Sequence, residues 1–188
     1  MNIFHRLVLA AALCAGAVAS AQTAKVSRPG EYSGYSPQLY TEVQRSSMYF
    51  RTRDGTRLAM DIHRPAINGK PVDTPYPVVW QHTAARRVAP DQALSVVRQM
   101  PALAQYGYVV VEVDRRGMGA SFGTRRAYHS RIEARDAYDI TEWLALQAWS
   151  TGKVGVYGCS NTGDAALHAI TLQPPHLKAA VAGCFSWS

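Results

Sequence analysis

A serine in a glycine-flanked run is the residue best suited by type and surroundings to nucleophilic chemistry. Ser160 lies in the run Gly158-Cys159-Ser160-Asn161-Thr162-Gly163, between an apolar segment and a segment with helical periodicity. Small residues allow the two backbones to approach closely at a tight turn, which holds the hydroxyl clear of the sheet. The N-terminus of the following helix favours negative charge. We therefore predict Ser160 as the nucleophile of an acyl transfer, with the backbone N–H of Asn161 as an oxyanion donor.

This run has two other interpretations, a phosphate-binding loop and a structural turn. Gly158 and Gly163 have the separation found in phosphate-binding loops, but Asp164 and Ala165 stand where those loops need lysine and Ser or Thr. Because an aspartate there would repel phosphate, the pattern argues against a phosphate site. A serine in a tight turn with no catalytic task remains open on the motif alone.

The elements that position this run alternate between strand and helix. Apolar and polar residues alternate over 46–52 and 58–62 around Asp54-Gly55, which predicts a β-hairpin followed by a loop over 66–76. Further strands are predicted over 77–80, 108–113, 154–157 and 177–182. Helices are predicted over 93–106 (kinked at Pro101 and ended by Gly107), 132–147 and 162–172. This order predicts an α/β fold with a mostly parallel, twisted sheet and helices on both faces.

The composition indicates one globular domain. The chain has 188 residues, of which 47% are hydrophobic and 18% charged. Its formal net charge of +7 comes mostly from scattered arginines, with no basic run of five or more. This dispersion argues against a nucleic-acid-binding protein.

The N-terminus has the layout of a secretory signal peptide. Arg6 precedes an apolar run over 7–18, and Ala19-Ser20-Ala21 supplies small residues for cleavage. The run is too short to anchor the chain in a membrane. We expect residues 1–21 to be removed, residues 22–45 to form an extended leader, and the protein to be exported to the periplasm or secreted.

Two cysteines, Cys159 and Cys184, remain beyond the predicted signal peptide. Both are expected at the ends of neighbouring strands, where an oxidising compartment would allow them to pair. Two unpaired, buried cysteines are the alternative.

Several short segments occur together in a fixed order, from Arg53 to Ala179, over about two-thirds of the chain. They are Arg53–Leu58, Gly107–Val111, Asp114–Ser121, Asp136–Asp139, Glu142-Trp143, Gln147–Ser150, Gly152–Gly155, the Ser160 run and Pro174–Ala179. In this order they resemble the N-terminal part of the cocaine esterase and X-prolyl dipeptidyl aminopeptidase family. The resemblance implies an α/β-hydrolase fold and cleavage of an ester or amide through an acyl-enzyme. The implied partners are small-molecule esters, amides or short peptides, with no cofactor and no metal.

The chain departs from this family at two positions. Members usually carry tyrosine after the nucleophile, where this chain has Asn161. Members also use a tyrosine hydroxyl from the loop after the third strand as an oxyanion donor, and Ala85 or Ala84 occupies that place here. The residues that could substitute as donors are His82, Thr83 and Arg86.

A serine nucleophile needs a base and an orienting carboxylate, which in α/β-hydrolases follow the serine along the chain. The candidates after Ser160 are Asp164, His168 and His176. Asp164 and His168 lie on the helix that begins at the serine, and His176 is expected at the opposite end of the sheet. None of the three suits the role, and His63 and His129 are expected to be ordinary surface-loop or strand-end histidines.

The chain ends at Ser188, just past a predicted strand whose outer edge would be unpaired and apolar. We therefore interpret residues 46–188 as the N-terminal part of a longer hydrolase domain, inactive by itself. The alternative is a non-catalytic remnant or binding protein that keeps the hydrolase sheet.

Overall fold

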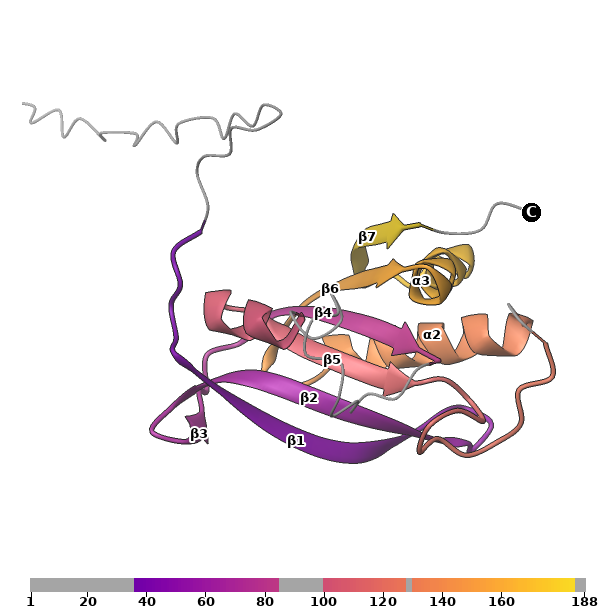
Figure 1. Ribbon diagram of the computed structural model, residues 1–188, viewed down its shortest axis with the longest axis horizontal. Coiled ribbons are helices and arrows are strands. Elements are labelled where there is room, and N and C mark those ends of the chain that lie inside the picture. Colours follow the sequence, from indigo (N-terminus) through magenta and orange to yellow (C-terminus); the bar gives the residue numbers. More distant parts are fainter. Residues whose placement is uncertain (1–35, 85–99, 128–129, 185–188) are drawn as a thin grey trace, which may run out of the picture. The chain divides into compact units, whose positions relative to one another are not determined.

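The computed structural model describes residues 36–84, 100–127 and 130–184, which form one mixed β-sheet flanked by helices (Figure 1). Its strands are β1 (Glu42–Arg51), β2 (Arg57–Ile67), β3 (Lys70–Pro71), β4 (Tyr76–Thr83), β5 (Val109–Asp114), β6 (Ser150–Cys159) and β7 (Leu177–Gly183). The order across the sheet is β1-β2-β5-β4-β6-β7, with β3 paired to β2. Strands β5, β4, β6 and β7 run parallel to one another, whereas β2 is antiparallel to both of its neighbours, β1 and β5. The predicted α/β architecture with an N-terminal hairpin is confirmed.

The hairpin between β1 and β2 forms where the sequence predicts it. Gly55 has a φ of 85°, and its N–H donates to the carbonyl of Thr52 at 2.8 Å. The Asp54 carboxylate accepts from the Thr52 hydroxyl at 2.7 Å and from the Thr56 N–H at 3.1 Å. β1 begins at Glu42, within the stretch assigned from the sequence to the extended leader.

The stretch predicted as a loop over 66–76 contains a second, shorter hairpin. Asn68 and Gly69 have φ values of 52° and 72°, as a two-residue turn with left-handed residues requires. This turn pairs Ile67 with Lys70, which extends β2 and creates β3. The loop prediction missed it because β3 is only two residues long.

Among the described residues, three helices pack on the sheet: η1 (Met100–Tyr106), α2 (Arg131–Ala145) and α3 (Asn161–Thr171). Ser130 caps α2, because its hydroxyl accepts a hydrogen bond from the N–H of Glu133 at 3.3 Å. Within the predicted helix over 93–106, residues 93–99 lie outside the described part, and the remainder is a 3-10 helix. Pro101 lacks the N–H that regular helical hydrogen bonding needs. Gly107, with a φ of 82°, ends the helix as predicted.

The core lies on both faces of the sheet, as predicted for a central strand of continuous apolar residues. Every residue of β5 is buried. Val109, Val111 and Val113 face α2 and α3, whereas Val110 packs on the η1 side with Met100. This alternation follows from the two-residue period of a strand, and it places helices on opposite faces.

Arg116 joins three separate segments by a buried ion-pair cluster. Its guanidinium donates to both carboxylate oxygens of Asp136 on α2, at 3.0 and 2.7 Å. It also donates to the Thr56 hydroxyl at 2.7 Å and lies 2.9 Å from the Asp54 carboxylate. These contacts hold the first hairpin turn and α2 against the loop that follows β5. The hydrogen bonds from Arg116 hold the pKa of Asp54 well below its usual value.

Strand β7 pairs with β6, and within residues 36–84, 100–127 and 130–184 no strand pairs with its other edge. Val181 on β7 is 57% exposed.

Over the same ranges, none of the helices combines the length and apolar character needed to cross a membrane.

We predict that Arg116→Met lowers the free energy of unfolding by about 3–5 kcal/mol, because it leaves the carboxylate of Asp136 buried without its partner. Arg53→Met is the matched control, since it removes an arginine–aspartate pair whose arginine side chain is 55% exposed. Its expected cost is about 1 kcal/mol or less. Urea unfolding of both variants measures the difference, and equal losses would contradict a structural role for the buried cluster.

Candidate active site

The backbone at Ser160 has the strained geometry that a nucleophile at a strand-to-helix turn requires. Ser160 has φ 57° and ψ −129°, and it is the residue between the last strand residue, Cys159, and the first residue of α3. A non-glycine residue in such a conformation costs on the order of 1–3 kcal/mol and persists only when its surroundings enforce it. The side chain is exposed, and its hydroxyl makes no capping hydrogen bond to α3.

Close contact between three backbones enforces this conformation. A Cβ added at Gly158 would lie 1.9 Å from the carbonyl oxygen of Thr162, and one at Gly163 would lie 2.4 Å from that of Gly183. Both positions therefore admit only glycine, because real carbon–oxygen contacts are far longer. The Ser160 N–H donates to the carbonyl of Gly183 at 3.0 Å, which links the turn to β7.

The hydroxyl of Thr162 closes the turn from inside. It donates to the carbonyl of Cys159 at 2.7 Å and accepts from the Cys159 N–H at 2.9 Å. The buried side chain of Gln81, near the end of β4, donates to the same hydroxyl at 3.3 Å. Gln81 thus supports the serine turn, and the sequence does not reveal this contact because the two residues are 81 positions apart.

Asn161, the predicted oxyanion donor, is the first residue of α3. The first N–H groups of a helix have no intrahelical acceptor and point toward the helix N-terminus, where negative charge is favoured. This position fits the predicted role of the Asn161 N–H, which stays a prediction.

Arg115 is a buried side chain of the site that the sequence did not single out. It is 1% exposed, and its guanidinium donates to the carbonyl of Asn161 and to that of His82, the latter at 3.3 Å. Its backbone N–H donates to the carbonyl of Thr83 at 2.8 Å. One arginine thus links the ends of β4 and β5 to the first residue of α3, and it brings a positive charge beside the turn.

The loop after β5 is held by Asp114. One carboxylate oxygen of Asp114 accepts from the Ala120 N–H at 2.9 Å, and its carbonyl accepts from the Ser121 hydroxyl at 2.7 Å. The Ser121 hydroxyl also accepts from the N–H of Ala59 on β2 at 2.8 Å. These contacts fix the start of the loop, and with it the neighbouring Arg115.

The candidate second oxyanion donors are only partly covered by the structure. Ala85 and Arg86 lie outside the described residues. His82 and Thr83 are each 2% exposed, at the end of β4. The His82 ring packs against Trp80 with their centroids 5.5 Å apart, and its Nε2 has no hydrogen-bond partner within the described ranges. Burial, reinforced by the charge of Arg115, holds the pKa of His82 well below its usual value, so the ring is neutral.

His176 and His63 are engaged with carboxylates away from the serine. Nδ1 of His176 lies 2.7 Å from the Glu142 carboxylate, and its backbone N–H donates to the same carboxylate at 3.1 Å. His63 corrects a prediction: it is not in a surface loop but lies within β2, 8% exposed, with Nε2 3.3 Å from Glu112 on β5. The sequence could not reveal this pair, because its members are 49 residues apart. His129 lies outside the described residues.

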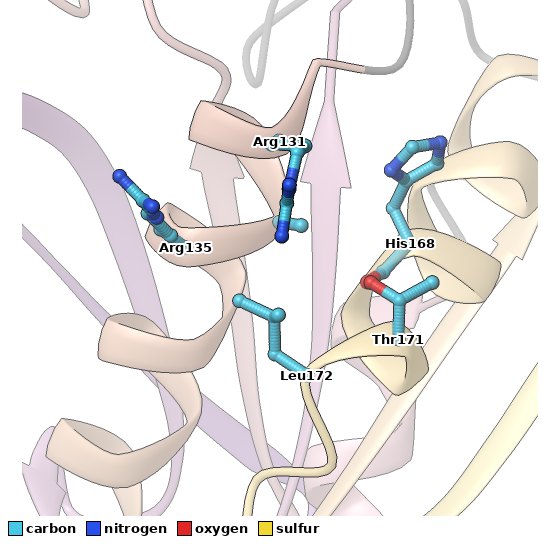
Figure 2. Close-up of a pocket in the computed structure, with 6 residues that line it drawn as sticks. Arg131, Arg135, His168, Thr171 and Leu172 are labelled. Atoms are coloured by element: carbon cyan, nitrogen blue, oxygen red, sulfur yellow. The ribbon is translucent and has the colours of Figure 1, made fainter.

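A cavity of about 340 Å³ lies between α2 and α3, apart from Ser160 (Figure 2). Arg131 and Arg135 line it from α2, and His168, Thr171 and Leu172 line it from the C-terminal half of α3 and the residue beyond. A helix rises about 1.5 Å per residue, so His168 is roughly 12 Å along the axis from the serine turn. Asp164, one helical turn from Ser160, is buried.

The part of the chain that the structure describes contains no cluster of three or more His, Cys, Asp or Glu side chains suited to a metal ion. Cys159 and Cys184 are unpaired, as the alternative of two unpaired, buried cysteines expects, but both are exposed, so the expected burial is wrong.

Comparison with known proteins identifies relatives along most of the chain. Residues 54–188 match the family model described as X-Pro dipeptidyl-peptidase (S15 family). A Mycobacterium bovis protein named as a serine esterase is 32% identical over 174 residues, which cover 85% of this chain and 27% of that protein. The cocaine esterase of a Rhodococcus species is 34% identical over 118 residues, which cover 63% of this chain and 19% of that enzyme. The chain thus spans about a quarter or less of the length of these relatives.

Solved structures show the same fold. A CocE/NonD family hydrolase from Staphylococcus aureus superposes with a TM-score of 0.61 at 28% identity, over 73% of this chain and 26% of that one. An alpha-amino acid ester hydrolase superposes with a TM-score of 0.64 at 24% identity, over 89% of this chain and 29% of that one. The second likeness concerns the fold alone.

We predict that Gly158→Ala destabilises the protein by about 3 kcal/mol or more, because the added methyl group overlaps the Thr162 carbonyl. Gly155→Ala, on the same strand, is the matched control, since its nearest neighbour would be 3.6 Å away. Its expected cost is below about 1 kcal/mol. Chemical unfolding of the two variants tests this, and a Gly158→Ala protein as stable as Gly155→Ala would disprove the close approach.

We predict that the protein loses stability in mild acid because His82 is buried in its neutral form. Its folded-state pKa is lowered by burial, whereas the unfolded chain takes up a proton near pH 6.5. The stability it contributes is therefore present above that pH and falls below it, by up to about 1.4 kcal/mol per pH unit. His82→Gln should flatten the dependence of unfolding free energy on pH between 6.5 and 5.5. At pH 8 the imidazole is neutral in both the folded and the unfolded chain, so a difference in stability there measures lost packing alone. Equal slopes of unfolding free energy against pH in the two proteins would rule out a buried neutral imidazole.

Proposed function

The chain belongs to the X-Pro dipeptidyl-peptidase (S15) family of α/β-hydrolases, and we propose that Ser160 is the nucleophile with which it cleaves an ester or amide bond. The observation that carries this proposal is the left-handed, solvent-exposed serine between β6 and α3. The close contacts of Gly158 and Gly163 support the same role, since they leave no room for a side chain at the turn that presents Ser160.

In the proposed reaction the Ser160 hydroxyl oxygen attacks the carbonyl carbon of the substrate. The hydroxyl proton passes to a base, and the carbonyl oxygen becomes an oxyanion that accepts from the N–H of Asn161. Collapse of this intermediate expels the alcohol or amine with a proton and leaves an acyl-enzyme, which water then hydrolyses. Arg115 is a positioning residue, because its guanidinium holds the Asn161 carbonyl and so fixes the peptide after the oxyanion donor.

The base and its carboxylate are proposed to come from outside these 188 residues. His176 is bound to Glu142, and His63 to Glu112. His168 lies two helical turns from the serine on the same helix, where its side chain cannot reach the hydroxyl. The relatives are several times longer than this chain, which supports the same conclusion. We therefore propose that the chain alone does not turn over an ester.

The substrate is proposed to be a small ester or amide, or a short peptide. Among relatives, one is named a serine esterase, another a cocaine esterase, and the matched family a dipeptidyl-peptidase.

We also propose that the protein is exported, which the signal-peptide layout of residues 1–21 supports.

A second candidate is a binding protein that keeps the hydrolase sheet without its chemistry. It is favoured by the alanine, Ala85 or Ala84, in the place where the resemblance predicts a tyrosine donor, and by the engagement of His63 and His176 elsewhere. In that case Ser160 would be exposed but unreactive.

We predict that the chain reacts covalently with a fluorophosphonate probe at Ser160 when imidazole is supplied as an external base. The exposed hydroxyl lies beside the donors at the start of α3, so it should be the preferred serine. Mass spectrometry should place the label in the tryptic peptide 154–178 of the chain, with no label there in Ser160→Ala.

Ser121→Ala is the matched control, because Ser121 lies in the loop after β5 and its hydroxyl is held by two hydrogen bonds. It should retain labelling at Ser160. Hydrolysis of a chromogenic ester should stay at the level of Ser160→Ala. Turnover clearly above that level would refute the missing base, and a folded chain that takes no label would favour the binding protein.

A further inference from the structure

Cys159 and Cys184 lie at the ends of neighbouring parallel strands, on either side of the nucleophile turn. Cys159 is the last residue of β6 and pairs in register with Gly183, the last residue of β7. Cys184 follows one residue beyond. A strand spacing of about 4.8 Å and a rise of about 3.3 Å per residue give a diagonal of roughly 5.8 Å between the two Cα atoms. Disulfides usually join residues whose Cα atoms are about 4.4–6.8 Å apart.

The backbone at Cys184 directs its side chain toward Cys159. Successive residues of a strand point to opposite faces, so an extended Cys184 would point away from Cys159. Cys184 instead has a φ of 52°, which breaks the alternation. The two thiols hydrogen-bond to each other, and this contact raises the pKa of Cys159. A non-glycine residue in this backbone conformation is uncommon, and here it brings two sulfur atoms together.

We propose that Cys159 and Cys184 form a disulfide that fastens β7 to β6 beside Ser160. The two thiols give up two protons and two electrons to a disulfide acceptor, such as oxidised glutathione or a thiol–disulfide oxidoreductase. One sulfur–sulfur bond forms in the protein, and the sulfur–sulfur bond of the acceptor is reduced to two thiols. Both cysteines are exposed, so a mixed-disulfide intermediate can form at either one.

The bond would act at the contact on which the serine turn depends. The Ser160 N–H donates to the carbonyl of Gly183, and Gly163 packs against the same carbonyl. Gly183 is itself the register partner of Cys159, and it directly precedes Cys184. Strand β7 is largely exposed, and a covalent link at its end would hold Gly183 in place under the turn. The enclosed loop, residues 160–183, contains all of α3.

The test uses the full chain incubated with oxidised glutathione, alkylated and digested with trypsin. Lys153 and Lys178 place Cys159 in peptide 154–178 and Cys184 in the peptide that begins at Ala179. We expect these two peptides to be joined. Cys14 lies in a third peptide, 7–25, and should remain alkylated as an internal control thiol.

Thermal unfolding gives the second measurement. The oxidised chain should unfold at least about 5 °C above the reduced chain, because the bond restricts the unfolded state. Cys184→Ser should show no difference between the two conditions. Cys14→Ser and Ser160→Ala should keep the difference in unfolding temperature between the oxidised and reduced chains. Because Ser160→Ala lacks the proposed nucleophile, its result tests the disulfide independently of that role.

The proposal is overturned if Cys159 and Cys184 both remain open to alkylation, or if either carries only glutathione. It is also overturned if either one pairs with Cys14 or with another chain. A joined pair that leaves the unfolding temperature unchanged would disprove the fastening of β7.

Discussion

The described part of the molecule depends on one steric constraint, the contact of three backbones around Ser160. Strand β6, helix α3 and strand β7 approach so closely that Gly158 and Gly163 leave no room for a side chain. This approach forces the serine into its left-handed conformation and turns the hydroxyl outward. Hydrogen bonds from Ser160 and Thr162 to neighbouring carbonyls offset part of that strain. The order of the parallel strands is what brings β7 to this contact.

Two consecutive arginines connect this contact to the rest of the sheet. Arg115 points toward the serine turn and donates to carbonyls on β4 and α3. Arg116 points the other way and joins Asp136 on α2 to the hairpin turn at Asp54. Their opposite directions follow from their place after the central strand β5, where Asp114 fixes the loop. Buried guanidinium groups need such partners, because an unpaired charge in the interior is costly.

The proposed site holds one half of the arrangement that acyl transfer requires. The exposed Ser160, the N-terminus of α3 and the side chains that support this turn are present and held by the contacts described above. Three of the described histidines serve the structure instead, since His63 and His176 pair with glutamates and His82 is buried beside Trp80. A proposed disulfide at Cys159 would add a covalent link at the same point. The serine turn and the cysteine pair therefore both lie at the edge formed by β6 and β7.

The sequence by itself determined whatever depends on local spacing. The glycines around Ser160, the Asp54-Gly55 turn and the apolar run of β5 predicted the serine turn, the hairpin and the buried central strand, because each depends on the backbone preferences of a few neighbouring residues. The order of short segments also identified the family, which the family model confirms.

Only the tertiary structure decided which side chains meet. The pairing of His63 with Glu112, and of Arg115 with Asn161, joins residues more than 40 positions apart on different strands and loops. The direction of Cys184 depends on a left-handed backbone that strand periodicity does not predict. Such contacts follow from strand order and register, and these are fixed when the whole sheet packs on α2 and α3. For the serine turn, the sequence supplied the glycines, and the packing of β7 against them supplied the strain.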